Sequence, residues 1–600
     1  MTPAKPFWRL AKLPLAIGLA STLAAPAYAV SFNIGDIEGQ FDSSMSLGAS
    51  WAMDKADKDL VGTPNGGIGF TTTGDDGRLN FKRGETFSKI FKGVHDLELR
   101  YGDTGVFVRG KYWYDFELKD ESRLFKDISD SNRKEGAQSS GAQILDAFIY
   151  HNYSLGDQPG SVRAGRQVVS WGESTFIMNS INSINPIDAA AARRPGAEVK
   201  EALLPVNMLY VSQSLTDQLA MEAFYQLEWD QTIAENCGTF FSVDVAADGC
   251  VDYPALSKAQ IDGLKAFGFP AVAAANGIRF TDEGVMIRRG QDRDARDSGQ
   301  WGLALRWLGE QTEYGAFIMN YHSRAPIVGY QNGSAADIQN AFATAGGAFA
   351  QPMLLGTGNY YLEYPEDIRL YGLSFSTTLP TGTAWQGEVS YRPNMPIALN
   401  TTINTGRIAT DPVGAFAGAG GGLAGVAAAA GRAGIDHRGY NRKEMTQVQT
   451  TFTHFFDQVM GADRLTVVGE IGATRLGGLE ARTYGRDAFS GNPFSDPLAA
   501  ARYGTGGYFT SSSWGYRTRA VWDYSDVFAG VNLSPVISWS HDVDGYGPTF
   551  NEGSKAVSIG VDANYRNTYS ASLSYTDFFG GDYNVMTDRD FLALSVGMNF

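Results

Sequence analysis

Apolar and polar residues alternate with a period of two along most of this chain, in segments separated by turns. In 105–117, for example, Val106, Val108 and Tyr112 fall on one face and charged residues on the other. This period predicts strands that each have one apolar and one polar face. The predicted strands are 44–53, 93–102, 105–117, 140–153, 161–170, 204–214, 217–229, 299–308, 312–323, 366–380, 383–393, 444–456, 462–475, 513–525, 528–540, 556–567, 569–578 and 590–600.

The connections between these segments alternate strictly between long and short. A transmembrane barrel has short periplasmic turns and long external loops, and an even strand number brings both termini to the periplasm. The pattern therefore predicts an all-β fold: a closed antiparallel transmembrane barrel of 16–18 strands, with eighteen favoured. The long connections are 54–92, 118–139, 171–203, 230–298, 324–365, 394–443, 476–512, 541–555 and 579–589.

Charged residues gather on the strand faces opposite the apolar residues. Lys or Arg on a lipid face costs roughly 2–4 kcal/mol near the midplane, so we expect these charges to line the lumen. Two interpretations stay open: internal salt-bridge packing, or a field that gives a pore its selectivity. The predicted lumen-lining residues are Arg109, Lys111, Glu222, Arg306, Glu388, Arg392, Glu470, Arg517, Arg519, Asp562 and Arg566.

Both ends of the chain indicate export to an outer membrane. Residues 1–29 combine three basic residues, an apolar stretch and a terminal Ala-Tyr-Ala, the layout of a cleaved signal peptide. The last strand ends on Phe600, which resembles the signal read by the outer-membrane assembly machinery. We therefore expect residues 30–600 to form one barrel domain in the outer membrane of a Gram-negative bacterium, in contact with its lipid.

Composition excludes several classes of protein. Loss of residues 1–29, which hold three basic residues and no acid, moves the formal charge from −16 to −19. An acidic chain argues against nucleic acid as a partner. The six His residues show no metal-ligand or catalytic spacing. We therefore expect neither an enzyme nor a cofactor or metal. Cys237 and Cys250 lie in one long connection of an exported chain, which predicts a disulfide.

Three of the long connections contain apolar stretches rich in Ala, Phe, Leu and Gly. They are 267–277, 338–356 and 412–431, and the last carries no charge. Because Gly is poor in helix interiors, 412–431 is interpreted as a flexible loop. External apolar patches can mark binding sites, which gives the hypothesis of a facilitator for hydrophobic molecules.

The segment 162–208 differs from the other connections, because it mixes apolar residues with closely spaced charges and lacks a hairpin pattern. It contains the third external loop, which we expect to fold inward and narrow the pore; an ordered external loop is the alternative. The residues predicted to form this constriction are Glu173, Asp188, Arg193, Arg194, Glu198 and Lys200.

This segment also resembles a known family. AGRQVVSWGES followed by INSINPIDAAAARRPGAEVKEALLPVNML is similar to the signature of domain-of-unknown-function family 1302, large proteobacterial proteins with a signal peptide and an outer-membrane barrel. The resemblance implies transport across the outer membrane. It also implies association with a periplasmic protein of lipoprotein-carrier-like fold and an inner-membrane exporter, in some cases during growth on steroids. The matching residues are Arg166, Ser170, Trp171, Gly172, Glu173, Asn182, Asn185, Pro186, Asp188, Arg193, Arg194, Pro195, Gly196, Glu198, Lys200 and Pro205.

Three functions fit the sequence. The first is a channel or facilitator for small molecules. The second is a facilitator for hydrophobic compounds such as sterols or lipids. The third is a barrel without an open pore that docks periplasmic partners or serves at the cell surface. The sequence sets neither the substrate nor the oligomeric state.

Overall fold

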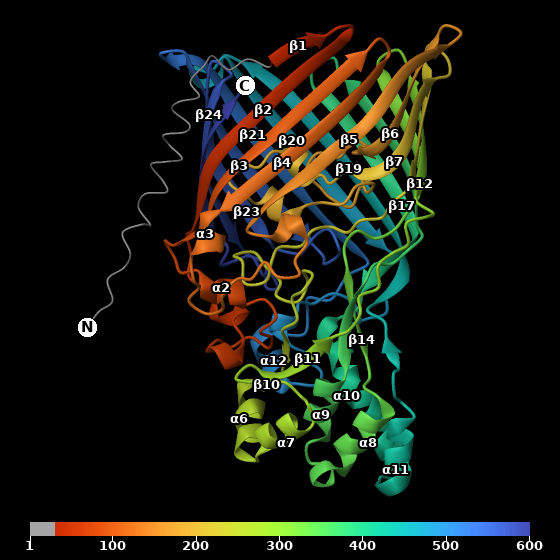
Figure 1. The fold of residues 1–600 in the computed structure, drawn as a ribbon, viewed down its shortest axis with the longest axis vertical. Coiled ribbons are helices and arrows are strands. Elements are labelled where there is room, and N and C mark those ends of the chain that lie inside the picture. Colours follow the sequence, from red (N-terminus) through yellow and green to blue (C-terminus); the bar gives the residue numbers. More distant parts are fainter. Residues whose placement is uncertain (1–29) are drawn as a thin grey trace, which may run out of the picture.

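The computed structural model describes residues 30–600 and shows a large closed β-barrel with a helical cap at one end (Figure 1). The predicted signal peptide lies outside the described residues. Eighteen strands within 30–600 form the barrel wall. They are β2 (Ile37–Ala52), β3 (Thr86–Tyr101), β4 (Thr104–Asp115), β5 (Ser140–Leu155), β6 (Gln158–Gln167), β7 (Val206–Ser214), β8 (Leu219–Gln226), β12 (Trp301–Leu308), β13 (Thr312–Tyr321), β16 (Ile368–Thr378), β17 (Ala384–Ala398), β19 (Tyr440–Asp457), β20 (Arg464–Leu476), β21 (Ser512–Phe528), β22 (Val531–Asp544), β23 (Lys555–Tyr565), β24 (Tyr569–Phe579) and β25 (Phe591–Asn599).

Every wall strand pairs antiparallel with its neighbours along the chain, and β25 closes the barrel on β2. In the closing pair, Ser44 lies opposite Asn599 and Gly48 opposite Ser595. The prediction of eighteen strands is therefore confirmed, and each predicted segment overlaps one strand. A short strand, β1 (Val30–Ile34), forms a hairpin with the start of β2 at the same end as the short turns (Figure 1).

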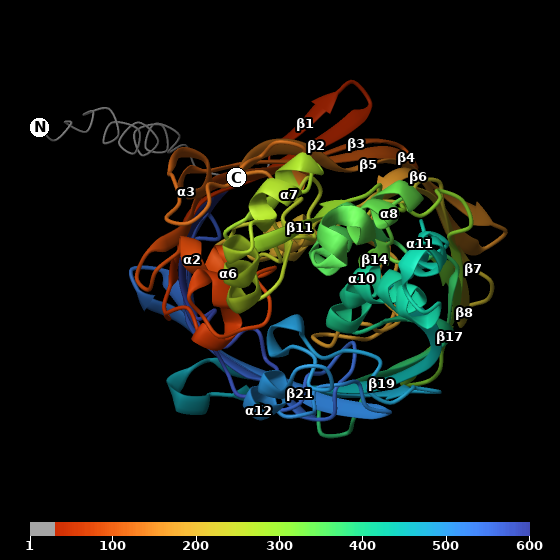
Figure 2. The ribbon, with the colours of Figure 1, turned by 90° about the horizontal axis from the view of Figure 1, so that it is seen from below.

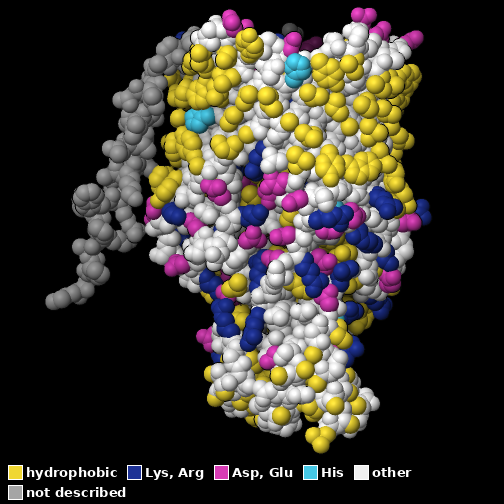
Figure 3. Space-filling view, turned by 45° about the vertical axis from the view of Figure 1, so that its right-hand side comes forward, with side chains coloured by type: hydrophobic (Ala, Val, Ile, Leu, Met, Phe, Trp, Pro, Cys, Tyr) yellow, Lys and Arg dark blue, Asp and Glu magenta, His cyan; other side chains and the backbone are white. Residues whose placement is uncertain are grey.

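The outward faces of the wall are apolar and exposed. Leu373 is 60% exposed, Ile559 57% and Val448 51%, although all three lie within regular strands. Figure 3 shows apolar side chains gathered over the half of the molecule nearest the short turns, with charged side chains beyond them. Such a band requires an apolar solvent, so the wall spans a membrane.

No helix within residues 30–600 has the length and hydropathy needed to cross a membrane.

Three long connections, after β8, β13 and β17, build the cap at the long-loop end. They contribute a six-stranded sheet and six helices, which pack around one hydrophobic core (Figures 1 and 2). The sheet strands are β9 (Tyr253–Ala255), β10 (Phe280–Thr281), β11 (Gly284–Arg289), β14 (Ile327–Gln331), β15 (Asn359–Glu363) and β18 (Asp436–His437). The helices are α6 (Lys258–Ala266), α7 (Phe269–Ala275), α8 (Ala335–Ala343), α9 (Ala350–Thr357), α10 (Thr401–Gly418) and α11 (Gly422–Ala430).

The cap corrects the sequence interpretation of the apolar connections. Residues 412–431 are not a flexible loop, because they complete α10 and form α11. The cost of Gly in these helices is offset by burial: Ile408 and Ala429 are fully buried in the cap core. Phe269 and Ile338, from the other two apolar stretches, are also fully buried there. These stretches cover each other only in part, because Phe267 and Leu423 stay 80% and 91% exposed.

Short helices lie in the remaining long connections. They are α2 (Asp76–Asn80), α3 (Phe116–Asp120), α4 (Ala189–Ala192), α5 (Val199–Ala202) and α12 (Pro497–Tyr503). Of these, α4 and α5 belong to the connection that enters the barrel.

Candidate functional site: the inward loop and the passage beside it

The connection between β6 and β7, residues 168–205, folds into the barrel and contacts its wall on several sides; we call it the inward loop. Its first arm begins with Trp171, whose indole Nε1 donates to Glu222 of β8 at 2.6 Å. The same ring packs against Phe224 and Phe317. The arm extends to Ile181, and near its end Asn179 donates to the carbonyl of Pro548 in the connection after β22. The prediction of an inward third loop is confirmed.

Two wall carboxylates hold the first arm by accepting backbone N–H groups. Glu388 of β17 accepts from the N–H of Glu173 at 2.6 Å and of Ile181 at 2.9 Å. Glu470 of β20 accepts from Thr175, Phe176 and Ile177. Because the loop backbone here lacks partners of its own, these predicted lumen residues satisfy groups that would otherwise be buried without hydrogen bonds.

The second arm of the loop, which contains α4 and α5, is held by two buried ion pairs on the opposite side of the barrel. Lys111 of β4 lies 2.8 Å from Asp188, and Lys92 of β3 lies 2.6 Å from Glu201. All four side chains are at most 5% exposed. Asp188 also caps α4 by accepting from the N–H of Ala191. Removing one partner of such a pair is strongly destabilising, so the arm is fixed in place.

Wall glycines make room for loop side chains where loop and wall meet. A Cβ at Gly372 would lie 2.7 Å from Ile181, and a Cβ at Gly472 would lie 2.8 Å from Ile177. Real Cβ atoms do not come so close to a neighbour, so the tight seat of the first arm depends on these two glycines. Within the loop, Gly172 has φ +88° and approaches Glu388.

The structure separates the six predicted constriction residues into three roles. Asp188 is a buried anchor. Glu173 is half-buried and is held through its backbone. The remaining four lie on the second arm and differ in their partners: Arg193 with Glu235 at 3.2 Å, Arg194 over the Trp113 ring, and Lys200 with Glu198 at 3.0 Å. Glu198 and Lys200 are partly exposed inside the barrel near the turn end.

Most of the predicted lumen charges are locked in polar networks. Arg109 pairs with Asp96 at 2.7 Å and Arg306 with Glu222 at 2.9 Å. Arg517 pairs with Asp542, and Arg392 donates to the backbone carbonyl of Ser180 in the loop. In this part of the lumen the charges are therefore satisfied by partners within the barrel.

Arg566 does not line the lumen. The strand β23 ends at Tyr565, so Arg566 lies in the short turn to β24, where its φ is +57°. The alternation of faces cannot be extended past the end of a strand, which is why the pattern misplaced it.

One side of the barrel interior stays open beside the inward loop. Directly paired residues share a face, so the pairing of Glu470 with Arg517 places Arg517 and Arg519 inward. The register carries this face on to Ser538, Ser558 and Asp562. On β21–β24 these inward side chains are exposed or half-buried. We call this surface the open wall.

The inward residues on β17–β20 are much less exposed than those on the open wall. On β17–β20 the inward residues Ser390, Gln447 and Glu470 are each 1% exposed, because the first arm covers them. On the open wall, Arg519 and Asp562 are exposed, and neither is in an ion pair with another described residue. The inward loop therefore covers one side of the interior and leaves the polar, serine-lined open wall accessible.

Two cavities, with volumes of about 440 and 620 Å³, lie at the long-loop end. The larger one, the mouth cavity, has a volume of about 620 Å³ and lies between the long connections. Its walls include Arg78, Arg193, Phe241, Arg486 and Arg589. At the turn end, a cavity of about 240 Å³ is lined by residues that include Lys200, Asp96 and Asn599.

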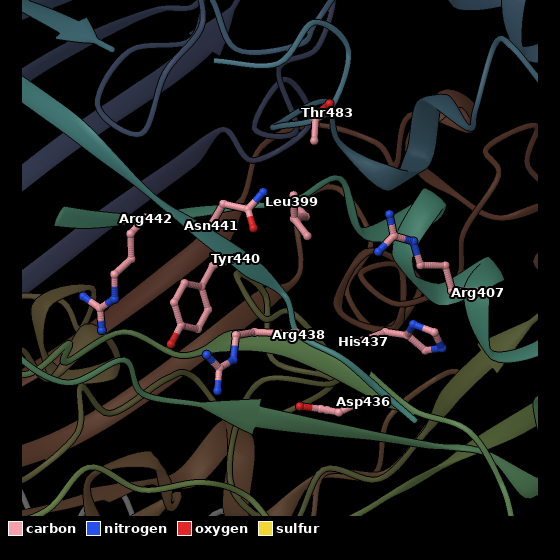
Figure 4. Close-up of a pocket in the computed structure, with 9 residues that line it drawn as sticks. All are labelled: Leu399, Arg407, Asp436, His437, Arg438, Tyr440, Asn441, Arg442 and Thr483. Atoms are coloured by element: carbon pink, nitrogen blue, oxygen red, sulfur yellow. The ribbon is translucent and has the colours of Figure 1, made fainter. Parts of the chain in front are cut away.

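The smaller cavity at the long-loop end has a volume of about 440 Å³ and lies beside the cap. Figure 4 shows it between α10, the start of β19 and the connection after β20, with Arg407, Arg438 and Arg442 around it. It is shallow and basic, and Arg438 is 56% exposed.

A buried acidic cluster also lies at the long-loop end. Carboxylate oxygens of Asp75, Asp76 and Glu283 lie within 4.8 Å of one another, as metal ligands do. The Lys126 ammonium is 2.9 Å from Asp76 and 2.6 Å from Glu283, so the cluster is already paired with a cation. Burial raises the pKa of Asp75 to about 7 and that of Asp76 to about 8.

Cys237 and Cys250 form a disulfide in the connection after β8. The carbonyl of Cys250 accepts from Tyr360 in the cap, and the Cys237 sulfur accepts from Arg133 in the connection after β4. The bridge therefore closes a segment that joins the cap to a neighbouring connection.

Sequence reasoning predicted Arg193 but missed the other residues of the mouth cavity. Arg78, Arg486 and Arg589 lie in three different connections, far apart in the chain. No periodic pattern relates them. The only available signal was that each is a basic residue close to aromatic residues in a long connection of an acidic chain.

The fold and the inward loop together define a class: a closed, even-stranded antiparallel barrel whose lumen is narrowed by one of its own loops. The chain belongs to the family described as "Protein of unknown function (DUF1302)", whose model matches residues 10–600. A search of curated proteins finds no match.

Solved structures with a similar course of the chain are outer-membrane proteins. The structure of Acinetobacter baumannii OccAB1 has 8% sequence identity and a TM-score of 0.40, over 96% of this chain and 98% of that one. The outer membrane protein OpdK from Pseudomonas aeruginosa has 9% identity and a TM-score of 0.39, over 94% and 98%. At these distances the function has to be inferred from this chain's own residues.

Proposed function

We propose that this protein is an outer-membrane channel through which small molecules diffuse. The observation that carries the proposal is the open wall: most inward side chains of β21–β24 remain accessible while the inward loop buries those of β17–β20. A plug would cover both sides. In this proposal the long-loop end faces outward and the short turns face the periplasm, as in other barrels of this type.

The proposed path has three parts. A solute enters the mouth cavity, passes between the inward loop and the open wall, and leaves past the cavity near Lys200 at the turn end. Arg519 and Asp562 are the unpaired charges on the open wall, and they set the field that a passing ion meets. Serine hydroxyls along the rest of the wall replace part of the water around a polar solute.

We propose more specifically that the solutes include hydrophobic compounds such as sterols or lipids. This proposal is supported by the aromatic side chains of the mouth cavity, among them Phe241, Phe509 and Phe550. The apolar stretches of the cap add less support, because Phe269 and Ile338 are buried in the cap core, although Leu423 is 91% exposed. A polar passage favours solutes that carry a polar or charged group as well.

Single-channel conductance of the refolded protein in a planar bilayer tests the proposal. We expect discrete current steps with a modest ion selectivity. A silent bilayer, with the barrel shown to be folded by its heat-modifiable gel mobility, would overturn the channel proposal and leave a docking or structural role.

A further inference from the structure

The mouth cavity has aromatic walls. It is built from connections after β2, β8, β20, β22 and β24, and it lies over the second arm of the inward loop, from which Arg193 projects into it. At about 620 Å³ it is large enough for a molecule of several fused or linked rings. The rings that line it are Phe241, Tyr253, Phe489, Phe509, Tyr546, Phe550 and Tyr583.

The charge of this cavity is opposite to that of the chain. Four arginines line it, and Asp487 is the only acidic residue among its lining residues, although the chain as a whole has a formal charge of −16. Two further carboxylates lie behind the surface: Asp588, bound to Arg78 at 2.9 Å, and Glu235, bound to Arg193 at 3.2 Å. The surface that a ligand would meet is therefore basic, while most of the carboxylates that balance it lie behind the arginines.

The positive charge of Arg486 is surrounded by neutral hydrogen-bond acceptors. Its guanidinium donates to backbone carbonyls, including those of Gly491 and Ser490 at 3.1 Å, and to the Tyr583 hydroxyl at 3.0 Å. Neutral acceptors satisfy its donors without cancelling its charge. The residue is 4% exposed, so this charge acts on the cavity through a medium with little water.

Arg589 provides a donor that no described residue uses. Its side chain is 3% exposed, and its Nη2 has no hydrogen-bond partner among the described residues. The nearest carboxylate oxygen is Oδ1 of Asp588, 3.8 Å from Nε, while Oδ2 of the same carboxylate is bound to Arg78. A buried guanidinium N–H without an acceptor is costly, and an anionic ligand would remove that cost.

We propose that the mouth cavity binds amphipathic anions that combine a flat apolar body with one carboxylate. Arg589 binds the carboxylate through Nη2, and Arg486 supports it by its charge. The aromatic rings pack against the apolar body. The proposal rests on the proposed channel function, because it names the class of solute that the channel selects before the passage.

Isothermal titration of the folded, full-length barrel with naphthoate and with naphthamide tests this assignment. The two probes have the same ring system and differ in charge at the head group. We expect saturable binding of naphthoate at least tenfold tighter than that of naphthamide, because a charge-assisted hydrogen bond is lost in the amide. Equal binding of the two, or binding of neither, would overturn the proposal.

The variant Arg589→Met keeps the length of the side chain and removes its donors. We expect it to bind naphthoate at least tenfold more weakly and naphthamide unchanged. The matched control is Arg438→Met, because Arg438 is an exposed arginine beside the shallow cavity of Figure 4 and should leave both affinities unchanged. Since the comparison of the two probes uses the unaltered protein, the test stands even if Arg589→Met fails to fold.

Bilayer recordings separate failure of this site from failure of the channel. Discrete conductance that naphthoate does not reduce, together with no selective binding, overturns the site and leaves the channel. Selective naphthoate binding in a barrel that does not conduct overturns the channel and leaves a binding site. Naphthoate block that is absent in Arg589→Met supports both.

Discussion

The ammonium of Lys111 in β4 lies 2.8 Å from the carboxylate of Asp188 in the inward loop, with both side chains almost fully buried. Since β4 is part of the wall and Asp188 begins α4, this pair joins the barrel directly to the element that narrows it. The position of the second arm therefore depends on this pair and on the pair of Lys92 with Glu201, which joins the arm to the neighbouring strand β3.

The variant Asp188→Asn should loosen the inward loop. The amide oxygen can still accept from the N–H of Ala191, but the charge that neutralises Lys111 is lost. Breaking such a pair costs about 3–5 kcal/mol. We expect higher single-channel conductance and faster protease cleavage within 168–205. Asp282→Asn is the control, because Asp282 is 96% exposed in its pair with Lys265 in the cap and should change neither reading. Wild-type conductance in Asp188→Asn would show that the pair does not hold the arm.

The unpaired charges of the open wall should set ion selectivity. Arg519→Glu should shift the reversal potential in a salt gradient toward cation preference, and Asp562→Asn should shift it toward anion preference. Arg566→Gln provides the control, because this residue lies in the turn beyond β23 and should have a much smaller effect. If Arg519→Glu leaves the reversal potential unchanged, ions do not pass along this wall.

The buried acidic cluster should make the long-loop end sensitive to pH. Burial raises the pKa of Asp75 to about 7, that of Asp76 to about 8 and that of Asp244 to about 6. Because these values exceed the ordinary value of about 4, the folded form binds more protons than the unfolded form. The stability from these groups is complete below about pH 4 and is lost as the pH rises through about 6 to 8.

Limited proteolysis of the connection after β2 checks this pH dependence. We expect wild-type protein to be cleaved several-fold faster at pH 8.5 than at pH 5.5, after correction for the activity of the protease. Asp75→Asn, which cannot ionise, should lower the rate at pH 8.5 and leave it unchanged at pH 5.5. Asp157→Asn, at the turn end, is the control and should follow the wild type at both values. A faster rate at low pH would contradict the assignment.

Removal of the disulfide should loosen the cap rather than the barrel. The bridge joins residues 13 apart, and a loop of about this size contributes about 3 kcal/mol by restricting the unfolded chain. In the double variant Cys237→Ser/Cys250→Ser we expect earlier thermal release of the segment 230–298 to protease. The heat-modifiable mobility of the barrel should stay unchanged. A lower barrel transition instead would show that cap and wall unfold together.

The sequence predicted the wall well because each wall strand has one face toward lipid. That environment requires an apolar residue at every second position, so the positions of Val106, Val108 and Tyr112 indicated which face of β4 is turned to the lipid. The largest differences are extensions: β2 and β3 begin at Ile37 and Thr86, outside the apolar band, where alternation is no longer required. The β17 strand continues to Ala398 past Pro393 and Pro396, which argued for an earlier end.

The interior and the cap could be predicted only in part. The unusual composition of the inward loop distinguished it from the other connections. The buried Asp188 was among the residues predicted there. Its partner Lys111 was also predicted, but their pairing depends on a contact 77 residues apart in sequence. The cap helices escaped prediction because their stability comes from burial against each other, which a weakly apolar sequence such as 412–431 does not reveal.

Three separate connections form the cap, so its core depends on the earlier pairing of the wall strands between them. The hydroxyl of Tyr253 meets that of Tyr330 at 2.7 Å and that of Thr405 at 3.0 Å, and each of the three residues comes from a different connection. Several wall strands separate them along the chain, so they meet only after those strands have paired. The core of the cap therefore forms only once the strands from β8 to β17 have brought these three connections together.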